Sequence, residues 1–420
     1  MPDKPFNFFY GWWNVATGFV GMGLSYAMFT VFVFGTFVGP LQAEFGWTRA
    51  ELSFALSMTN IAIVIASPCV GLVIDRFGVK RTLIPSLIMM GIVVGSMSLL
   101  SENIWHYYAL YFLIPFLGAG SLPQSFSRVL IAWFAKRRGI ALGISLSGFG
   151  VGAALIPYYA QLMIDSYGWR MAYVGFMIAI FCVSLPMTIF LLKEKPEELG
   201  LRADGNNADD DDDLSLDESI IDPNSGMTAS AAAKTKNYWL ILFSFMLVGV
   251  GITSVLAHLV PMLIDRGIAP QKAAWCMTSL GLGLIFGRIF AGYLMDRFFA
   301  PYVTAAFLLG LIIGIMILAS GTSSVLVFVA AILVGMATGS EISEIAYICS
   351  RYFGQKAFGQ IYGFMFSAFQ LGSAFGAPLL GAYYDKMGDY IGALWLVAAV
   401  VFIGTILIIG LSPYPQRLED

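Results

Sequence analysis

Twelve long apolar stretches, separated by short polar breaks, constrain this chain more than any other feature of its sequence. A transmembrane helix needs about 20 predominantly apolar residues to cross the hydrocarbon core of a bilayer. The stretches lie near residues 12–40, 51–74, 82–100, 106–134, 139–163, 170–192, 237–264, 272–295, 302–320, 323–349, 360–384 and 390–412. Of the 420 residues 58% are hydrophobic and only 12% are charged, against about 25% charged in soluble domains. The sequence therefore predicts an all-α integral membrane protein with twelve transmembrane helices.

The basic residues predict how these helices are oriented. Lys and Arg in short loops lie preferentially on the cytoplasmic side of a membrane. With the N-terminus inside, sixteen of the 23 Lys and Arg lie on that side. Five lie outside, namely Arg49, Arg170, Arg266, Lys272 and Lys386. We therefore expect both termini in the cytoplasm, and the first stretch lacks the cleavage site of a removable signal peptide.

The sequence repeats itself after about half its length. GLVIDRFG at 71–78 resembles GYLMDRFF at 292–299, which gives an offset of 221 residues. Such self-similarity indicates a duplicated structural unit, here of six spans. Because six is an even number, both copies enter the membrane from the same side, and this predicts two parallel six-helix halves. We place them at residues 1–192 and 237–420.

Residues 193–236, between the two halves, have a different composition. They include KEKPEE at 193–198 and the acidic run Asp209 to Asp213. A segment of this kind buries too little apolar surface to fold on its own. We expect a disordered acidic linker in the cytoplasm, with a regulatory or cation-binding role as the alternative.

Two motifs resemble those of a known family. GLVIDRFGVKR at 71–81 resembles the signature that the major facilitator superfamily carries between its second and third spans, and Asp296–Arg297 repeats part of it. Glycines let helices approach closely, and the charged residues can join neighbouring helix ends. The resemblance implies the major facilitator fold, in which spans one, four, seven and ten line a central cavity. It also implies a conformational gate formed by Asp75, Arg76, Arg81, Asp296 and Arg297.

A narrower resemblance is to the monocarboxylate transporters and their bacterial relatives, including the oxalate/formate antiporters. It rests on YGWWNVATGFV at 10–20, on WFAKRRGIALGISLSGFG at 133–150, and on Arg288 followed by Gly292. The resemblance implies that Arg288 binds the carboxylate of the substrate.

This chain departs from those relatives at three places. Thr30 stands where animal members have a lysine, and Leu284 stands where they have an aspartate one turn before the arginine. The span 360–384 lacks the lysine that oxalate carriers use for a second carboxylate. We therefore expect a monoanionic substrate, and proton coupling that differs from that of the animal carriers.

Charged side chains within the spans are the main candidates for a transport site. They cost about 2.5–3.5 kcal/mol each on insertion scales, so they normally face a water-filled cavity or one another. Arg128, Arg288, Glu341 and Glu344 are such residues. The repeat offset places Arg128 opposite Tyr347, one helical turn from Glu344, so spans four and ten are expected to carry opposite charges at similar depth.

These charges suggest how a proton and an anion could move together. Protonation of a glutamate would free an arginine to bind a carboxylate through its planar fork. Glu341 and Glu344 share a helical face and are expected to titrate as a pair, and His258 is a candidate proton relay. We expect the substrate to be bound by Arg288, Arg128, Tyr26, Phe29 and Tyr347. Alternatively, the arginines and glutamates are structural ion pairs, and His258 is a packed, hydrogen-bonded residue.

The sequence therefore predicts a proton-coupled symporter of small organic monocarboxylates in the bacterial inner membrane, working as a monomer by alternating access. It predicts no cofactor, metal or nucleic-acid partner, and neither a nucleophile motif nor a metal-ligand cluster indicates an enzyme. Three alternatives remain open. They are an organic anion exchanger without net proton movement, an exporter of hydrophobic cations that uses Glu341 and Glu344, and a membrane sensor.

Overall fold

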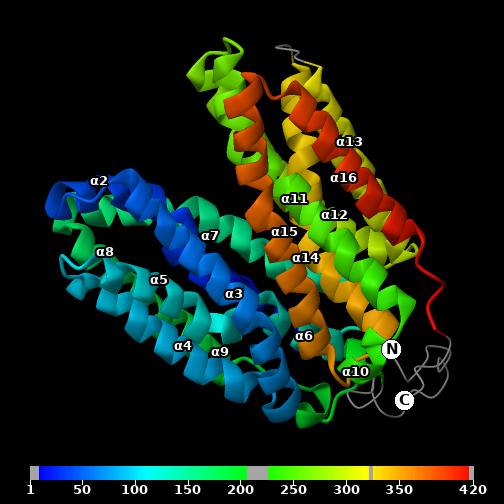
Figure 1. Cartoon of the computed structure of the whole chain (residues 1–420). Helices are drawn as coiled ribbons and strands as arrows, with labels where there is room; N and C mark the ends of the chain where they lie inside the picture. Colours follow the sequence, from blue (N-terminus) through cyan, green and yellow to red (C-terminus); the bar gives the residue numbers. More distant parts are fainter. Residues whose placement is uncertain (1–8, 206–225, 321–324, 416–420) are drawn as a thin grey trace, which may run out of the picture.

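The computed structural model describes residues 9–205, 226–320 and 325–415, and its long segments are helical (Figure 1). Nine continuous spans are α3 (Arg49–Phe77), α4 (Val79–Ser96), α7 (Arg138–Tyr167), α11 (Lys236–Asp265), α12 (Pro270–Met295), α13 (Ala300–Ala319), α14 (Leu326–Phe353), α15 (Phe358–Met387) and α16 (Ile391–Ile409). Three further spans are composite: α1 (Gly11–Gly23) with α2 (Phe34–Phe45), α5 (Ile104–Leu117) with α6 (Pro123–Trp133), and α8 (Trp169–Ala179) with α9 (Leu185–Phe190). The predicted architecture of twelve membrane-spanning helices is confirmed.

The fourth span is interrupted at mid-depth, and for this reason only eleven of the described helices are long enough by themselves to cross a membrane. A short 3-10 turn, Gly118–Ser121, separates α5 from α6. Pro123 lacks a backbone N–H and so opens a new helix more readily than it continues one. Ser86 of α4 satisfies the freed backbone, because its hydroxyl donates to the Leu117 carbonyl (2.5 Å) and accepts from the Gly120 N–H (2.9 Å). Irregular backbone is tolerated at this depth because protein surrounds it.

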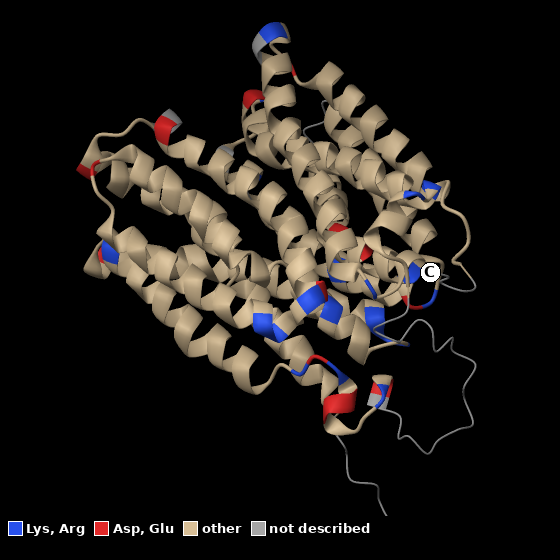
Figure 2. Ribbon diagram, turned by 60° about the horizontal axis from the view of Figure 1, so that its bottom comes forward, with Lys and Arg blue, Asp and Glu red and all other residues tan. Residues whose placement is uncertain are grey.

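The two six-span halves meet at the end of the molecule that carries the linker and diverge toward the opposite end (Figure 1). Across the boundary α3 packs against α15, and α7 packs against α12. Lys, Arg, Asp and Glu lie mostly at the helix ends, with long stretches of helix free of them (Figure 2). This distribution is typical of helices surrounded by hydrocarbon.

Glycines bring the two halves into direct contact. A β-carbon on Gly71 of α3 would lie 2.2 Å from the carbonyl oxygen of Gly359 of α15, and one on Gly139 of α7 would lie 2.1 Å from that of Gly292 of α12. β-Carbons in proteins essentially never approach another atom within 3.0 Å. Any larger side chain at these positions would therefore force the halves apart. Gly71 and Gly292 are also separated by the repeat offset, so the two contacts are equivalent.

The two ends of the linker are ordered. Short helices form at Pro196–Leu199 and at α10 (Ala229–Ala233). The Glu194 carboxylate accepts hydrogen bonds from the first two N–H groups of α4, at 2.7 and 3.0 Å. At the other end, the Met227 N–H donates to the Phe353 carbonyl at 2.9 Å.

The prediction of disorder is therefore wrong for residues 193–205 and 226–236. Their composition is polar, but their carboxylates and backbone groups bond to helix ends that need partners. The acidic run Asp209 to Asp213 lies outside the described residues.

Candidate functional site

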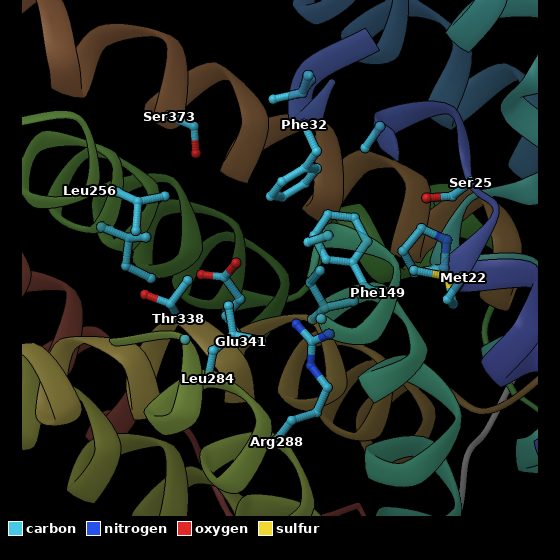
Figure 3. A pocket seen from close by; sticks show the side chains of 18 of the residues that line it. Met22, Ser25, Phe32, Phe149, Leu256, Leu284, Arg288, Thr338, Glu341 and Ser373 are labelled. Carbon is cyan, nitrogen blue, oxygen red and sulfur yellow. The ribbon is translucent and has the colours of Figure 1, made fainter. Parts of the chain in front are cut away.

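A cavity of about 670 Å³ lies between the two halves. Helices of both halves form its wall, and Arg288 and Glu341 are its charged lining residues (Figure 3). Most of the remaining lining is apolar, and its uncharged polar side chains are Ser25, Tyr26, Asn60, Ser121, Thr253, Thr278, Thr338, Gln370 and Ser373. The size is within the range of about 300–1,000 Å³ seen for small-molecule sites, and a mainly apolar wall with few polar groups is typical of them.

Arg288 is almost completely buried, with 1% of its surface exposed. Its Nε donates to the Gly339 carbonyl of α14 and its Nη1 donates to the Leu146 carbonyl of α7, both at 2.6 Å. The guanidinium carbon also lies 5.9 Å from the ring centroid of Phe149. Because α12 and α14 belong to one half and α7 to the other, this side chain joins the two halves at the wall of the cavity.

Ser67 is the counterpart of Arg288 in the first half, at the repeat offset of 221 residues. Its hydroxyl donates to the Gly363 carbonyl of α15 at 3.2 Å and to the Gln124 side chain at 3.0 Å. Both residues therefore make a contact between the halves, but only the second half contributes a cation. The duplicated fold thus contains a one-sided charge.

Glu341 and Glu344 of α14 have different surroundings although they are three residues apart. Glu341 lines the cavity, and its Oε2 has no hydrogen-bond partner. Glu344 is buried outside the cavity lining, and its Oε1 is unpartnered. Neither glutamate forms an ion pair with Arg288 in the described part of the chain. The alternative of structural pairing among the four charges is therefore not what the structure shows.

Arg128 does not line the cavity. Its guanidinium forms an ion pair with Asp75 at the end of α3. The sequence placed Arg128 at the correct depth, but helix rotation points it toward the linker-side end of α3 and away from Glu344. This position corrects the expectation that Arg128 contacts substrate.

The predicted aromatic lining is present in part. Tyr26 lines the cavity, whereas Phe29 is fully buried with its ring 5.1 Å from that of Phe176. The cause is a π-helical turn, Met28–Phe32, which changes the face that follows it and points Phe32 into the cavity. Sequence reasoning missed Phe32, because periodicity does not reveal a π-turn.

Tyr347 and His258 also lie away from the cavity lining. Tyr347 is buried on the linker side of Glu344. His258 Nε2 is hydrogen-bonded to the Ala377 carbonyl at 2.9 Å, and its ring lies 5.5 Å from that of Tyr390. The packed, hydrogen-bonded alternative therefore describes His258 in this structure.

Two aspartates connect the halves at the linker side. Asp75 accepts hydrogen bonds from the N–H groups of Gly359 (3.0 Å) and Gln360 (2.8 Å) at the start of α15. Asp296 accepts from the N–H groups of Gly139 (2.6 Å) and Ile140 (3.0 Å) at the start of α7. A carboxylate is favourable there because it satisfies free N–H groups and the positive end of the helix dipole. We call these two contacts the aspartate latches.

The three arginines predicted for the gate are positioned differently. Arg76, Arg81 and Arg297 are exposed, and none of them bonds across the interface in the described part of the chain. Arg76 lies over the ring of Phe77, and Arg297 lies over that of Tyr293. In this arrangement the aspartates and glycines, and not these arginines, hold the halves together.

Acid should strengthen the Asp296 latch. Burial raises the pKa of this carboxyl, just beyond the end of α12, from 3.8 to about 6, although the two N–H groups and Arg138 lower it. When the halves separate, the carboxyl becomes exposed and its pKa falls again. The closed arrangement thus binds the proton more tightly, so it is stabilised as pH falls through about 6 and weakened as pH rises through it. Spin-label distances across the linker-side interface should show this shift between about pH 5 and pH 7.5.

The Asp296→Asn protein should lose most of this pH dependence. Asp165→Asn, at the opposite end of α7, changes an exposed carboxyl and should leave it intact. An unchanged pH response in Asp296→Asn would show that another group is responsible.

Comparisons with known proteins agree with this architecture. The family model of the Major Facilitator Superfamily matches residues 18–375 and again 239–419. Monocarboxylate transporter 11 of Mus musculus is 23% identical over 98% of this chain and 89% of its own length. Monocarboxylate transporter 12 of Xenopus laevis is 23% identical over 91% of this chain and 85% of its own length. The uncharacterized MFS-type transporter YhjX of Escherichia coli K12 is 21% identical, with 83% of each chain covered.

Among solved structures, the chain is similar to the crystal structure of the transporter FucP in the outward conformation. The TM-score is 0.68 at 16% sequence identity, with 94% of this chain and 97% of that chain covered. At this identity the similarity is one of fold.

Proposed function

This chain belongs to the Major Facilitator Superfamily, and from that premise we propose that it carries small organic monocarboxylates together with a proton. It is a multi-pass membrane transporter and not an enzyme. The relatives named monocarboxylate transporters support the choice of substrate class. The location of Arg288 in the cavity wall is the observation on which the proposal rests.

Arg288 supplies the cation that an anionic substrate needs. A carboxylate that leaves water for a largely apolar cavity requires a compensating charge and hydrogen bonds. Guanidinium groups bind carboxylates through charge-assisted hydrogen bonds that fix their orientation. The two carbonyls that accept from Nε and Nη1 hold the group in place at the cavity wall.

Glu341 is the proposed carrier of the proton. The cavity wall contains one cationic and one anionic side chain. A bound carboxylate alone would leave the ionised site with a net negative charge, which is unfavourable inside a membrane. Protonation of Glu341 together with anion binding keeps the site neutral. Glu344 lies outside the lining and would act only through its electrostatic effect on Glu341.

Alternating access would then use the aspartate latches. With the linker side closed and the halves divergent at the other end, the cavity loads from the side opposite the linker. Release requires that Asp75 and Asp296 leave the ends of α15 and α7. Following the distribution of basic residues, we propose that the linker side is cytoplasmic, that the membrane is the bacterial inner membrane, and that one chain is the working unit.

Uptake into vesicles tests this proposal. Purified protein in vesicles without internal substrate should accumulate labelled acetate, pyruvate or phenylacetate when the outside is made acidic, and a protonophore should abolish accumulation. Vesicles with no protein give the background of passive entry by the neutral acids. Uptake that requires an internal acid and ignores the pH gradient would instead indicate an exchanger.

A further inference from the structure

We propose that the substrate is a monocarboxylate with an aromatic or medium-length aliphatic body, and not a two- or three-carbon acid. The geometry further points to Phe149 and Phe32 as the residues that determine this preference. The inference rests on the proposed function, because it takes Arg288 as the site of the carboxylate.

An aromatic pair begins directly beside the guanidinium. The ring of Phe149 lies 5.9 Å from the guanidinium carbon of Arg288. Phe32 meets Phe149 edge to face, with centroids 5.4 Å apart and an interplanar angle of 82°. Both rings line the cavity, and they follow one another away from Arg288 (Figure 3). A carboxylate bound to Arg288 therefore places the rest of its molecule against these two rings.

The opposite wall is also apolar. Phe366 and Phe369 of α15 line the cavity with ring centroids 6.3 Å apart, and Leu284 and Leu256 line it from α12 and α11. The aromatic surfaces come from both halves of the protein. A flat or flexible apolar body between them would contact protein on two sides.

Exposure of Phe32 is the second reason for a large apolar occupant. This side chain is 38% exposed although it belongs to the wall of a cavity between helices. Phe29, only one turn earlier, is fully buried. The π-helical turn thus exchanges a buried ring for one that has no protein surface to cover it completely. Apolar surface left in water is unfavourable, and a bound apolar group removes it.

The volume of the cavity supports the same conclusion. At about 30 Å³ per water molecule in the liquid, 670 Å³ corresponds to roughly twenty waters. Acetate or pyruvate would replace only a few of them and would leave the aromatic wall wet. Each methylene that a longer acid buries fully should raise its affinity by up to about fourfold.

A series of acids with the same charge tests the inference. Binding of acetate, butanoate, hexanoate, phenylacetate and 3-phenylpropanoate to purified protein would be measured by isothermal titration calorimetry at one pH. We expect dissociation constants to fall about two- to fourfold per added methylene. Phe149→Ala should flatten this series while changing acetate affinity by less than about twofold, and Phe149→Leu should restore part of the slope. Phe286→Ala, a lipid-facing change on α12 outside the lining, is the matched control.

The outcomes separate the two levels of the proposal. Equal affinities across the series, or tightest binding of acetate, would overturn the inference while the proposed function stands, provided that Arg288→Gln abolishes binding. Absence of binding for all acids, or binding unaffected by Arg288→Gln, would contradict the proposed function itself. Tighter binding of L-phenylalanine than of 3-phenylpropanoate would also overturn the inference, because Glu341 would then recognise a cationic group.

Discussion

Arg288→Gln should reduce both binding and transport of every monocarboxylate by at least about 100-fold, since it removes the charge that compensates the substrate in a cavity of low polarity. Glutamine keeps a donor of similar reach, so the loss reports on charge more than on volume. Arg288→Lys should lie between the two, with a loss of about tenfold, because lysine retains the charge but not the planar fork. Binding by calorimetry and uptake into vesicles measure the two effects separately.

The control for this experiment concerns the second role of Arg288. Its bonds to the Gly339 and Leu146 carbonyls join three helices, so its loss is also expected to lower the thermal unfolding midpoint. Ser67→Ala removes the equivalent contact of the first half and leaves the cavity charge intact. It should lower stability while transport persists. Substantial transport by Arg288→Gln would contradict the monocarboxylate proposal and favour an exporter of hydrophobic cations.

Glu341→Gln should abolish accumulation driven by a pH gradient and leave exchange of internal for external substrate largely intact. Glutamine resembles a permanently protonated glutamate, so the site can bind the anion and stay neutral but cannot release a proton. Accumulation under an acidic exterior should fall to the level of protein-free vesicles. Counterflow, measured with unlabelled acid inside and labelled acid outside, should remain within about threefold of the unchanged protein.

Glu344→Gln is the matched control, since it makes the same chemical change three residues away. Spacing alone made Glu344 the candidate whose amide should lose acid-driven uptake. The structure transfers this prediction to Glu341, because only Glu341 lines the cavity. Retained coupling in Glu341→Gln together with lost coupling in Glu344→Gln would reverse the assignment, and an unchanged pH dependence in both would reject the mechanism.

Features set by composition and by repetition were predictable from the sequence. Apolar length indicates helices because a backbone inside lipid must form its own hydrogen bonds. The offset of 221 residues that relates Gly71 to Gly292 also relates Asp75 to Asp296, and the structure uses both pairs in equivalent contacts. Arg288 was identified as a buried charge with small neighbours, and it lies in the wall of the cavity.

Features that depend on helix rotation were not predictable. Depth within the membrane follows from residue number, but the direction of a side chain depends on local geometry that differs between spans. The π-turn at Met28–Phe32 exchanges Phe29 for Phe32, and the break before Pro123 reorients the helix that carries Arg128. Partner choice was equally hidden, since Arg128 pairs with an aspartate more than fifty positions earlier.

The contrast between Ser67 and Arg288 has a consequence for how cargo selection can change. A perfectly duplicated carrier would offer its cargo two equivalent poses, whereas a single cation allows only one. Under the proposed function, the second half holds the acidic head, while Phe32 and Phe149 of the first half read the tail. Substitutions in the first half could then retune the spectrum of transported acids without disturbing the charge chemistry that makes the protein a carrier of acids.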